Sequence, residues 1–220
     1  MAFPLTHLCV AYHILTKHPI PAPELFLLGS IAPDAVHSRA EFKGSSQSNI
    51  GPAKKVTHLC PISDEKWGRI TDNDGWVESV KAFISKNPNN PLLLGYAVHV
   101  LTDIFNNKGL WHYFSTNYPE EAARGYNSNY YADLRNIDLR LYNEFVKNSK
   151  MMDLLKNSTS QDISGLIARD ELEDIRNHLL NIAYADIPDN AYTNNYFYVT
   201  YDQTLEFIND AAEFCVKHLL

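Results

Sequence analysis

The sequence contains few cysteines, no excess of positive charge and no long apolar run. Its three cysteines, Cys9, Cys60 and Cys215, form no Cys-x-x-Cys pair, which argues against a disulfide framework and a cysteine-rich zinc module. The formal net charge of -7 disfavours a protein that binds duplex nucleic acid through its phosphates. No apolar stretch approaches the roughly 20 residues that span a bilayer. The amino-terminal segment lacks the basic region of a signal peptide, so we expect a cytoplasmic protein.

Strand-like patterns are scarce as well. Residues 194–201 alternate in the manner of a strand but have no partner segment, so we expect a loop or an extended segment there. Elsewhere apolar residues recur at helical spacing, and hydrophobic residues make up 45% of the chain, enough for a sizeable core. Helices are expected over 5–16, 24–31, 72–85, 91–113, 151–155, 169–185 and 204–220, with one or two more within 118–146. The sequence therefore predicts a single all-α domain over residues 1–220.

Residues 38–54 separate two of these helices and are polar and rich in Gly and Ser, a composition typical of a mobile loop. Loops beside a rigid site often contact substrate or close over it. A plain surface loop is the alternative.

The segment 91–113 places two polar residues inside a nearly continuous apolar run. His99 and Asp103 are four residues apart, which puts them on the same face of a helix. Burying an imidazole and a carboxylate is costly unless each finds a partner. A divalent metal ion would satisfy both. A His–Asp hydrogen bond within the helix, or pairing of Asp103 with a basic residue, would also do so.

Three further polar residues, His7, Asp34 and His58, are also embedded in apolar sequence. With His99 and Asp103 they make a set of three imidazoles and two carboxylates without a thiolate. Such a set suits Zn²⁺, and Mn²⁺, Fe and Ni²⁺ are also compatible with it. We therefore predict a metal site between buried helices.

Four segments around these residues resemble the zinc-dependent phospholipase C family, which is related in fold to the S1/P1-type nucleases. The segments are Thr6-His7-Leu8, Phe26 to Asp34, Thr57-His58 and Leu94 to Asp103, and the resemblance covers roughly residues 4–112. Its most specific parts are Leu-Gly-x-x-x-Pro-Asp and Gly-Tyr-x-x-His-x-x-x-Asp.

This resemblance implies an all-α zinc hydrolase that attacks phosphoesters with a metal-activated water. The substrate would be a small phosphoester or a phospholipid head group. The main zinc would be held by Asp34, His58, His99 and Asp103. His7 would hold or approach a neighbouring ion, and Asp34 would also be the catalytic base or a water-orienting carboxylate.

The family supplies another metal with a His-x-x-x-Glu pair downstream of the central helix, whereas residues 129–138 of this chain contain no His. The resemblance therefore implies one complete metal site and one incomplete one. Candidates for the second metal or for a substrate contact are His37, His112, Asp133 and Asp138. His37 and His112 are also candidates for a general acid, and an exposed loop histidine is the alternative for His37.

Other functions are also compatible with an all-α, His- and Asp-rich chain. A metal-stabilised helical module without turnover would have no open coordination position. A nuclease on the same fold could stack bases on its many aromatic side chains, but the negative charge ranks it below a hydrolase of small phosphoesters. An HD-type phosphohydrolase is disfavoured because the chain has no adjacent His-Asp dipeptide.

Overall fold

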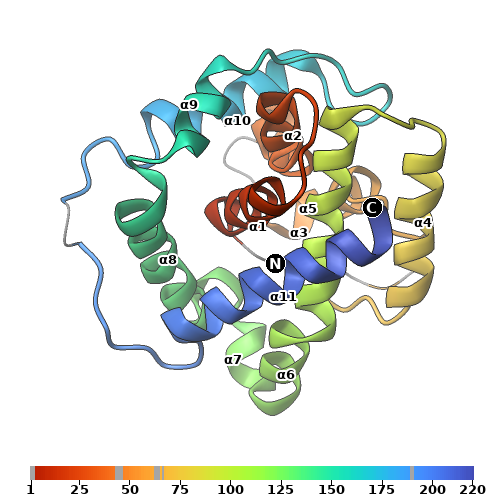
Figure 1. Ribbon diagram of the computed structural model, residues 1–220. Coiled ribbons are helices and arrows are strands. Elements are labelled where there is room, and N and C mark those ends of the chain that lie inside the picture. The colour runs from red at the N-terminus through yellow and green to blue at the C-terminus, as the bar shows by residue number, and fades with distance from the viewer. Residues whose placement is uncertain (1–2, 43–46, 62–64, 66, 189–190) are drawn as a thin grey trace.

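The computed structural model describes residues 3–42, 47–61, 65, 67–188 and 191–220 (Figure 1). Its α-helices are α1 (Pro4–Lys17), α2 (Pro23–Gly29), α3 (Gln47–Thr57), α4 (Asn73–Ser85), α5 (Pro91–Lys108), α6 (Leu110–Asn117), α7 (Pro119–Ala123), α8 (Asn129–Leu141), α9 (Lys150–Asn157), α10 (Arg169–Asn181) and α11 (Tyr201–Leu219). Short 3-10 turns η1 (Ala32–Ser38), η2 (Ala40–Phe42) and η3 (Gly125–Asn127) and a π-turn η4 (Tyr142–Val146) connect them. The described residues form no β-strand, only an isolated bridge between Ile163 and Ile167. The predicted all-α class is confirmed.

Helix α5 is the centre of this arrangement, because it packs against α1, α2, α4, α6 and α11. Thirteen of its 18 residues are buried, as the apolar run predicts. In Figure 1 the red helix α1 lies beside α5 near the middle of the molecule, and the blue helix α11 passes below α1 and crosses in front of α5. Helix α5 begins after the cap residue Asn90, whose side chain accepts a hydrogen bond from the Leu93 amide, and it ends at Gly109.

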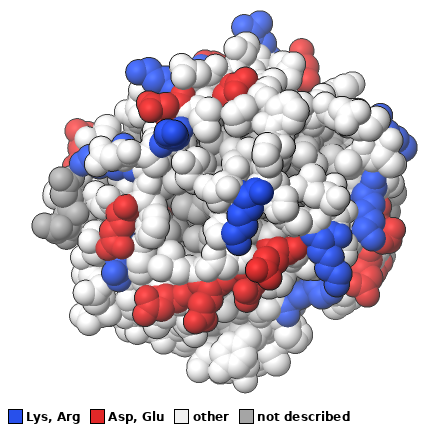
Figure 2. Space-filling view, viewed as in Figure 1, with Lys and Arg blue, Asp and Glu red and all other residues white. Residues whose placement is uncertain are grey.

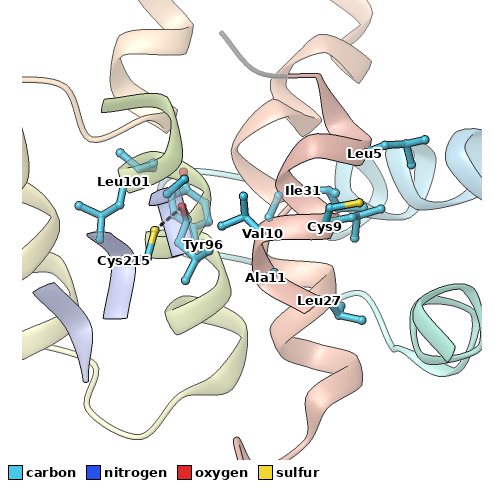
Figure 3. Close-up of a cluster of buried hydrophobic side chains, with 14 of the residues drawn as sticks. Leu5, Cys9, Val10, Ala11, Leu27, Ile31, Tyr96, Leu101 and Cys215 are labelled. Carbon is cyan, nitrogen blue, oxygen red and sulfur yellow. Dashed lines mark hydrogen bonds between the residues drawn. The ribbon is translucent and has the colours of Figure 1, made fainter. Parts of the chain in front are cut away.

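The core on either side of α5 is apolar and includes two of the cysteines (Figure 3). Cys9 of α1 and Cys215 of α11 are buried, and burial raises the pKa of each thiol to about 12. Neither is positioned as a nucleophile. Cys60 is half-buried, and all three cysteines are free thiols, as expected from their spacing.

Helices α2 and α5 lie in close backbone contact where two glycines face each other. A Cβ atom on Gly95 would lie 1.9 Å from the Phe26 carbonyl oxygen, and one on Gly29 would lie 2.0 Å from the Leu92 carbonyl oxygen. Any side chain at either position would therefore overlap backbone that cannot move aside. This contact fixes the end of α2, and hence Ser30 and the η1 turn that carries Asp34, against the middle of α5.

The prediction of a mobile loop over 38–54 is wrong for most of the described part of that segment. Residues 38–42 lie in η1 and η2 or adjoin them, and helix α3 begins at Gln47 despite the Pro52 inside it. Residues 43–46 lie outside the described residues. Ile50, Lys54 and Thr57 are buried at helical spacing, so tertiary packing outweighs the local helix-breaking residues.

The segment that precedes α11 and the outer surface of α11 complete the description of the fold. Residues 194–200 form neither a helix nor a strand, as predicted, whereas Tyr201 begins α11. The outer face of α11 carries Asp202, Glu206, Asp210 and Glu213, which form a row of acidic side chains along the lower part of the face in Figure 2. No helix among the described residues is long and apolar enough to cross a membrane.

The contact between the glycines predicts a large and local effect of one methyl group. Gly95→Ala should lower the free energy of unfolding by about 3 kcal/mol or more, because overpacking against fixed backbone is costly. Gly51→Ala is the matched control: this helical glycine has 3.7 Å to its nearest neighbour, so alanine should be neutral or raise stability by up to ~1 kcal/mol. Urea unfolding measures both, and equal effects of the two substitutions would contradict the packing described here.

Candidate metal centre

The structure brings together all five residues that the sequence singles out as metal ligands. His7 comes from α1, Asp34 from η1, His58 from the residue after α3, and His99 and Asp103 from successive turns of α5. The side chains of the three histidines and of Asp103 are at most 2% exposed, and that of Asp34 is 15% exposed. Four segments distant in sequence therefore converge on one buried polar cluster.

The ligand atoms lie at separations close to those around a single ion. The Nε2 atoms of His58 and His99 are 3.3 Å apart, and His58 Nε2 is 3.5 Å from Asp34 Oδ1 and 3.6 Å from Asp103 Oδ2. Ligands of a tetrahedral zinc ion with bonds of 2.0–2.1 Å are about 3.3 Å from each other. His99 Nε2 and Asp34 Oδ2 are farther apart, at 4.0 Å. Two sets of three ligands lie within 4.8 Å of one another, His7–His99–Asp103 and Asp34–His58–His99, and they share His99.

Backbone carbonyls determine which ring nitrogen of His99 and His58 faces the cluster. The Nδ1 of His99 lies 2.7 Å from the Ser30 carbonyl oxygen, and that of His58 lies 3.0 Å from the Lys54 carbonyl oxygen. A carbonyl only accepts hydrogen bonds, so Nδ1 of His99 carries the proton and its Nε2 presents a lone pair. His58 Nδ1 also lies 3.1 Å from the Thr57 hydroxyl, and a proton on this nitrogen would leave His58 Nε2 as a second lone pair that faces the first. In that tautomer the two nitrogens fit a metal site, and carbonyls that orient ligand imidazoles in this way are typical of one.

The position of His58 depends on contacts made by the end of α3. The indole nitrogen of Trp76 donates a hydrogen bond to the His58 carbonyl oxygen at 2.7 Å, and the Tyr96 hydroxyl donates one to the Thr57 carbonyl oxygen. The ring of Trp67 meets the His58 imidazole edge-on at 4.8 Å. Aromatic residues from α4 and α5 thus hold the last turn of a helix that the sequence pattern did not predict.

His7 completes the cluster from the α1 side. Its ring stacks on that of His99 with centroids 3.6 Å apart, and its Nε2 lies 3.5 Å from Asp103 Oδ1. Neither ring nitrogen of His7 has a hydrogen-bond partner in the described part of the chain. A buried imidazole in this state is rare without an ion or water, which supports a ligand role for His7.

The protonation states in the cluster suit a cation. Burial alone would raise the pKa of Asp34, but the Lys54 ammonium holds it well below its usual value. Burial likewise opposes ionisation of Asp103, and the contact with His7 outweighs it and lowers the pKa. Burial lowers the pKa of His58 and His99, and His7 lowers that of His99 further. Neutral imidazoles and ionised carboxylates are the forms that bind metal.

Sequence reasoning missed Lys54, whose ammonium lies 2.7 Å from Asp34 Oδ1. Lys54 is 3% exposed and its ammonium lies 5.3 Å from the centroid of the Trp67 ring. The sequence signal was obscured because Lys54 falls in the segment that was interpreted as a loop. Once the helix is recognised, Lys54 precedes His58 by one turn and shares its face.

The cluster is reached from two sides. Asp103 lines a pocket of about 880 Å³ whose walls include Trp67, Trp111 and the exposed His112. Asp34, His37 and Lys54 line a second pocket of about 500 Å³. The Tyr131 side chain of α8 lines both pockets. The carboxylates therefore stand between two openings rather than in a closed core.

Asn106 is a second residue that the sequence analysis did not single out. It is 4% exposed, lies one turn after Asp103 on α5 and lines the larger pocket. Its side-chain amide makes no hydrogen bond to a described residue, in contrast to its neighbour Asn107, which bonds to Ile70 and Asn73. A buried amide without a partner that borders a pocket is available to a ligand.

Of the four candidates for a second metal or a substrate contact, His37 and His112 line pockets beside the cluster, whereas Asp133 and Asp138 make contacts within the fold. His37 Nε2 lies 3.7 Å from Asp34 Oδ1, and burial with the nearby Lys54 lowers its pKa to about 4. His112 borders the larger pocket. Asp133 accepts hydrogen bonds from the backbone amides of residues 197–199 at 2.7–3.1 Å, which ties the extended segment to α8.

Asp138 is buried and accepts a hydrogen bond from the Tyr184 hydroxyl. Burial raises its pKa from 3.8 to about 7, against the opposing effect of that hydrogen bond. The contacts of Asp133 and Asp138 thus serve the packing of α8, and we do not assign either residue to a second metal.

Comparison with known proteins adds no relative: no protein family, curated protein or solved structure matches the chain. The buried His and Asp cluster is therefore the feature of this protein that indicates its function.

The raised pKa of Asp138 predicts a pH-dependent gain in stability on its neutralisation. An acid with a higher pKa in the folded state destabilises the fold progressively as pH rises from the unfolded value towards 7. The stability advantage of Asp138→Asn over wild type should therefore grow by roughly 2–3 kcal/mol between pH 5 and pH 8. Urea unfolding of chelator-treated protein measures it. Asp202→Asn, on the exposed face of α11, is the control, and parallel curves for Asp138→Asn and wild type would contradict the prediction.

Proposed function

We propose that this protein is a metal-dependent hydrolase of phosphoesters, with zinc as the preferred ion, and that it resembles the zinc-dependent phospholipase C family in its chemistry. The observation that carries the proposal is the pair of Nε2 atoms of His58 and His99, 3.3 Å apart in a buried site flanked by the carboxylates of Asp34 and Asp103, whose pKa values are lowered. When bound, the ion would supply Lewis acidity towards a phosphoryl oxygen and an activated water.

The protein's own residues would divide the remaining work. The carbonyls of Ser30 and Lys54 hold two imidazoles in the ligand tautomer, so little reorganisation accompanies binding. The low pKa of Asp34 favours a role as ligand and water-orienting group over that of a proton acceptor. His37 Nε2, 3.7 Å from Asp34 Oδ1, is placed for proton transfer on that side.

The larger pocket is the proposed place of the substrate. It reaches Asp103, is walled by tryptophans and carries Asn106 and the exposed cations Arg69 and Lys108. Cations near the mouth suit an anionic phosphoester in an otherwise acidic protein. The pocket's size accommodates a small phosphoester or a phospholipid head group.

A metal-stabilised helical module without turnover is the second candidate, and the deep burial of four of the five ligands favours it. Access to Asp34 and Asp103 from two pockets favours the enzyme. A panel of phosphodiesters and phosphomonoesters, assayed with and without chelator, separates the two. Zinc-bound protein that hydrolyses none of them would support the module.

Metal analysis tests the proposal directly. Purified wild type should bind zinc, and His58→Ala and Asp103→Ala should each weaken binding at least about tenfold because each removes a ligand. Equilibrium dialysis followed by elemental analysis measures this. His18→Ala, at the opposite end of α1 from His7, is the control and should bind like wild type. Wild type that binds no zinc or other transition metal would refute the hydrolase and the module together.

Asn106 provides a test of the substrate pocket that is independent of the metal. Asn106→Ala should lower kcat/KM about tenfold for whichever ester the panel identifies, the usual cost of one lost hydrogen bond, while zinc content stays the same. Asn117→Ala, on the exposed side of α6, is the control. An unchanged kcat/KM would place the substrate elsewhere.

A further inference from the structure

Lys54 brings an amino group into a cluster whose chemistry already suits a metal ion. Its ammonium lies 2.7 Å from Asp34 Oδ1, the same oxygen that His58 and His37 approach at 3.5 and 3.7 Å. Burying an ammonium to 3% exposure costs several kcal/mol unless it is paired. The face of the Trp67 ring, 5.3 Å away, adds a second favourable contact.

The charges of the cluster limit how many ions it can take. Asp34 and Asp103 supply two negative charges, and Lys54 supplies one positive charge. One divalent ion brings the site to a net charge of +1, whereas two would bring it to +3 in surroundings of low dielectric, where uncompensated charge is expensive. A single ion with Lys54 leaves a modest positive charge for an anionic substrate group.

Lys54 is also reachable. With Asp34 and His37 it lines the pocket of about 500 Å³, and the other walls of that pocket include Phe42, Ile50 and Tyr131. A small anion that enters there meets the ammonium and the neutral His37 imidazole beside the proposed metal ligands. An ammonium binds phosphate as a point charge with several donors.

We propose that Lys54 acts as the second cation of the site: the chain binds one divalent ion, and the Lys54 ammonium beside Asp34 binds a phosphoryl oxygen of the substrate. The inference rests on the proposed function, and it explains how the chain could manage without a second set of metal ligands. It makes Lys54 both a competitor of the metal for Asp34 and a partner of the anion.

These two roles predict that replacing Lys54 with a neutral residue raises the affinity for zinc and lowers the affinity for phosphate. In Lys54→Met, zinc affinity should rise about tenfold or more, because a like charge beside a metal ligand has been removed. Affinity of the zinc-loaded protein for inorganic phosphate should fall about tenfold or more, because one charge-assisted contact is lost. Competition with a chelator measures the first change and titration calorimetry the second. Damage to the fold would weaken both.

Matched variants separate charge from packing. Lys54→Arg keeps the charge and should bind phosphate within about threefold of wild type. Lys55→Met removes a neighbouring cation from the same helix and should change neither affinity. Lys54→Gln retains a donor for Asp34 and supplies the same test if methionine at this position prevents folding.

Several outcomes would overturn the inference. Wild type that binds two zinc ions per chain would do so, as would Lys54→Met or Lys54→Gln with unchanged or weaker zinc affinity or with unchanged phosphate affinity. In each of these cases the proposed hydrolase stands. Wild type without any bound transition metal would overturn the proposed function and this inference with it.

Discussion

The contact between α2 and α5 at Gly29 and Gly95 is the constraint on which the cluster depends. Because neither residue has a side chain, the two backbones approach until a Cβ atom on Gly95 would lie 1.9 Å from the Phe26 carbonyl oxygen. Ser30, the next residue after Gly29, then presents its carbonyl to His99, four residues after Gly95. Asp34 follows in the η1 turn. The glycine contact thus sets the distance between two sides of the site and the tautomer of one ligand.

That constraint also gives a physical meaning to the two sequence motifs that contain these glycines. In Leu-Gly-x-x-x-Pro-Asp the glycine makes the contact and the aspartate, five residues on, enters the cluster. In Gly-Tyr-x-x-His-x-x-x-Asp the glycine makes the same contact from α5, and the Tyr96 hydroxyl reaches the Thr57 carbonyl oxygen and holds the end of α3 beside it. Each motif therefore combines a packing position with a ligand.

The cluster carries a cost that the rest of the fold must offset. Three imidazoles and a carboxylate are removed almost completely from water, and burial acts against the charged forms of His58, His99 and Asp103. They persist because they contact one another and two backbone carbonyls, and because Lys54 pairs with Asp34. A polar site of this kind in an apolar core is typical of function rather than of stability.

Much of this protein could be predicted from local pattern, and the rest could not for a definable reason. Helical periodicity and the caps at Asp72 and Asn90 are local, so most helices and the all-α class followed from them. His7, Asp34, His58, His99 and Asp103 were detectable because a polar residue within an apolar run needs a partner. Helix α3 was missed because Pro52 and its Gly- and Ser-rich surroundings disfavour a helix locally, while contacts with Trp76 and Tyr96 far along the chain stabilise its last turn. The same long-range packing decides that Lys54 faces Asp34 and that Asp133 binds the amides of residues 197–199: the partner of a buried charge is chosen by how helices pack, which no local spacing encodes.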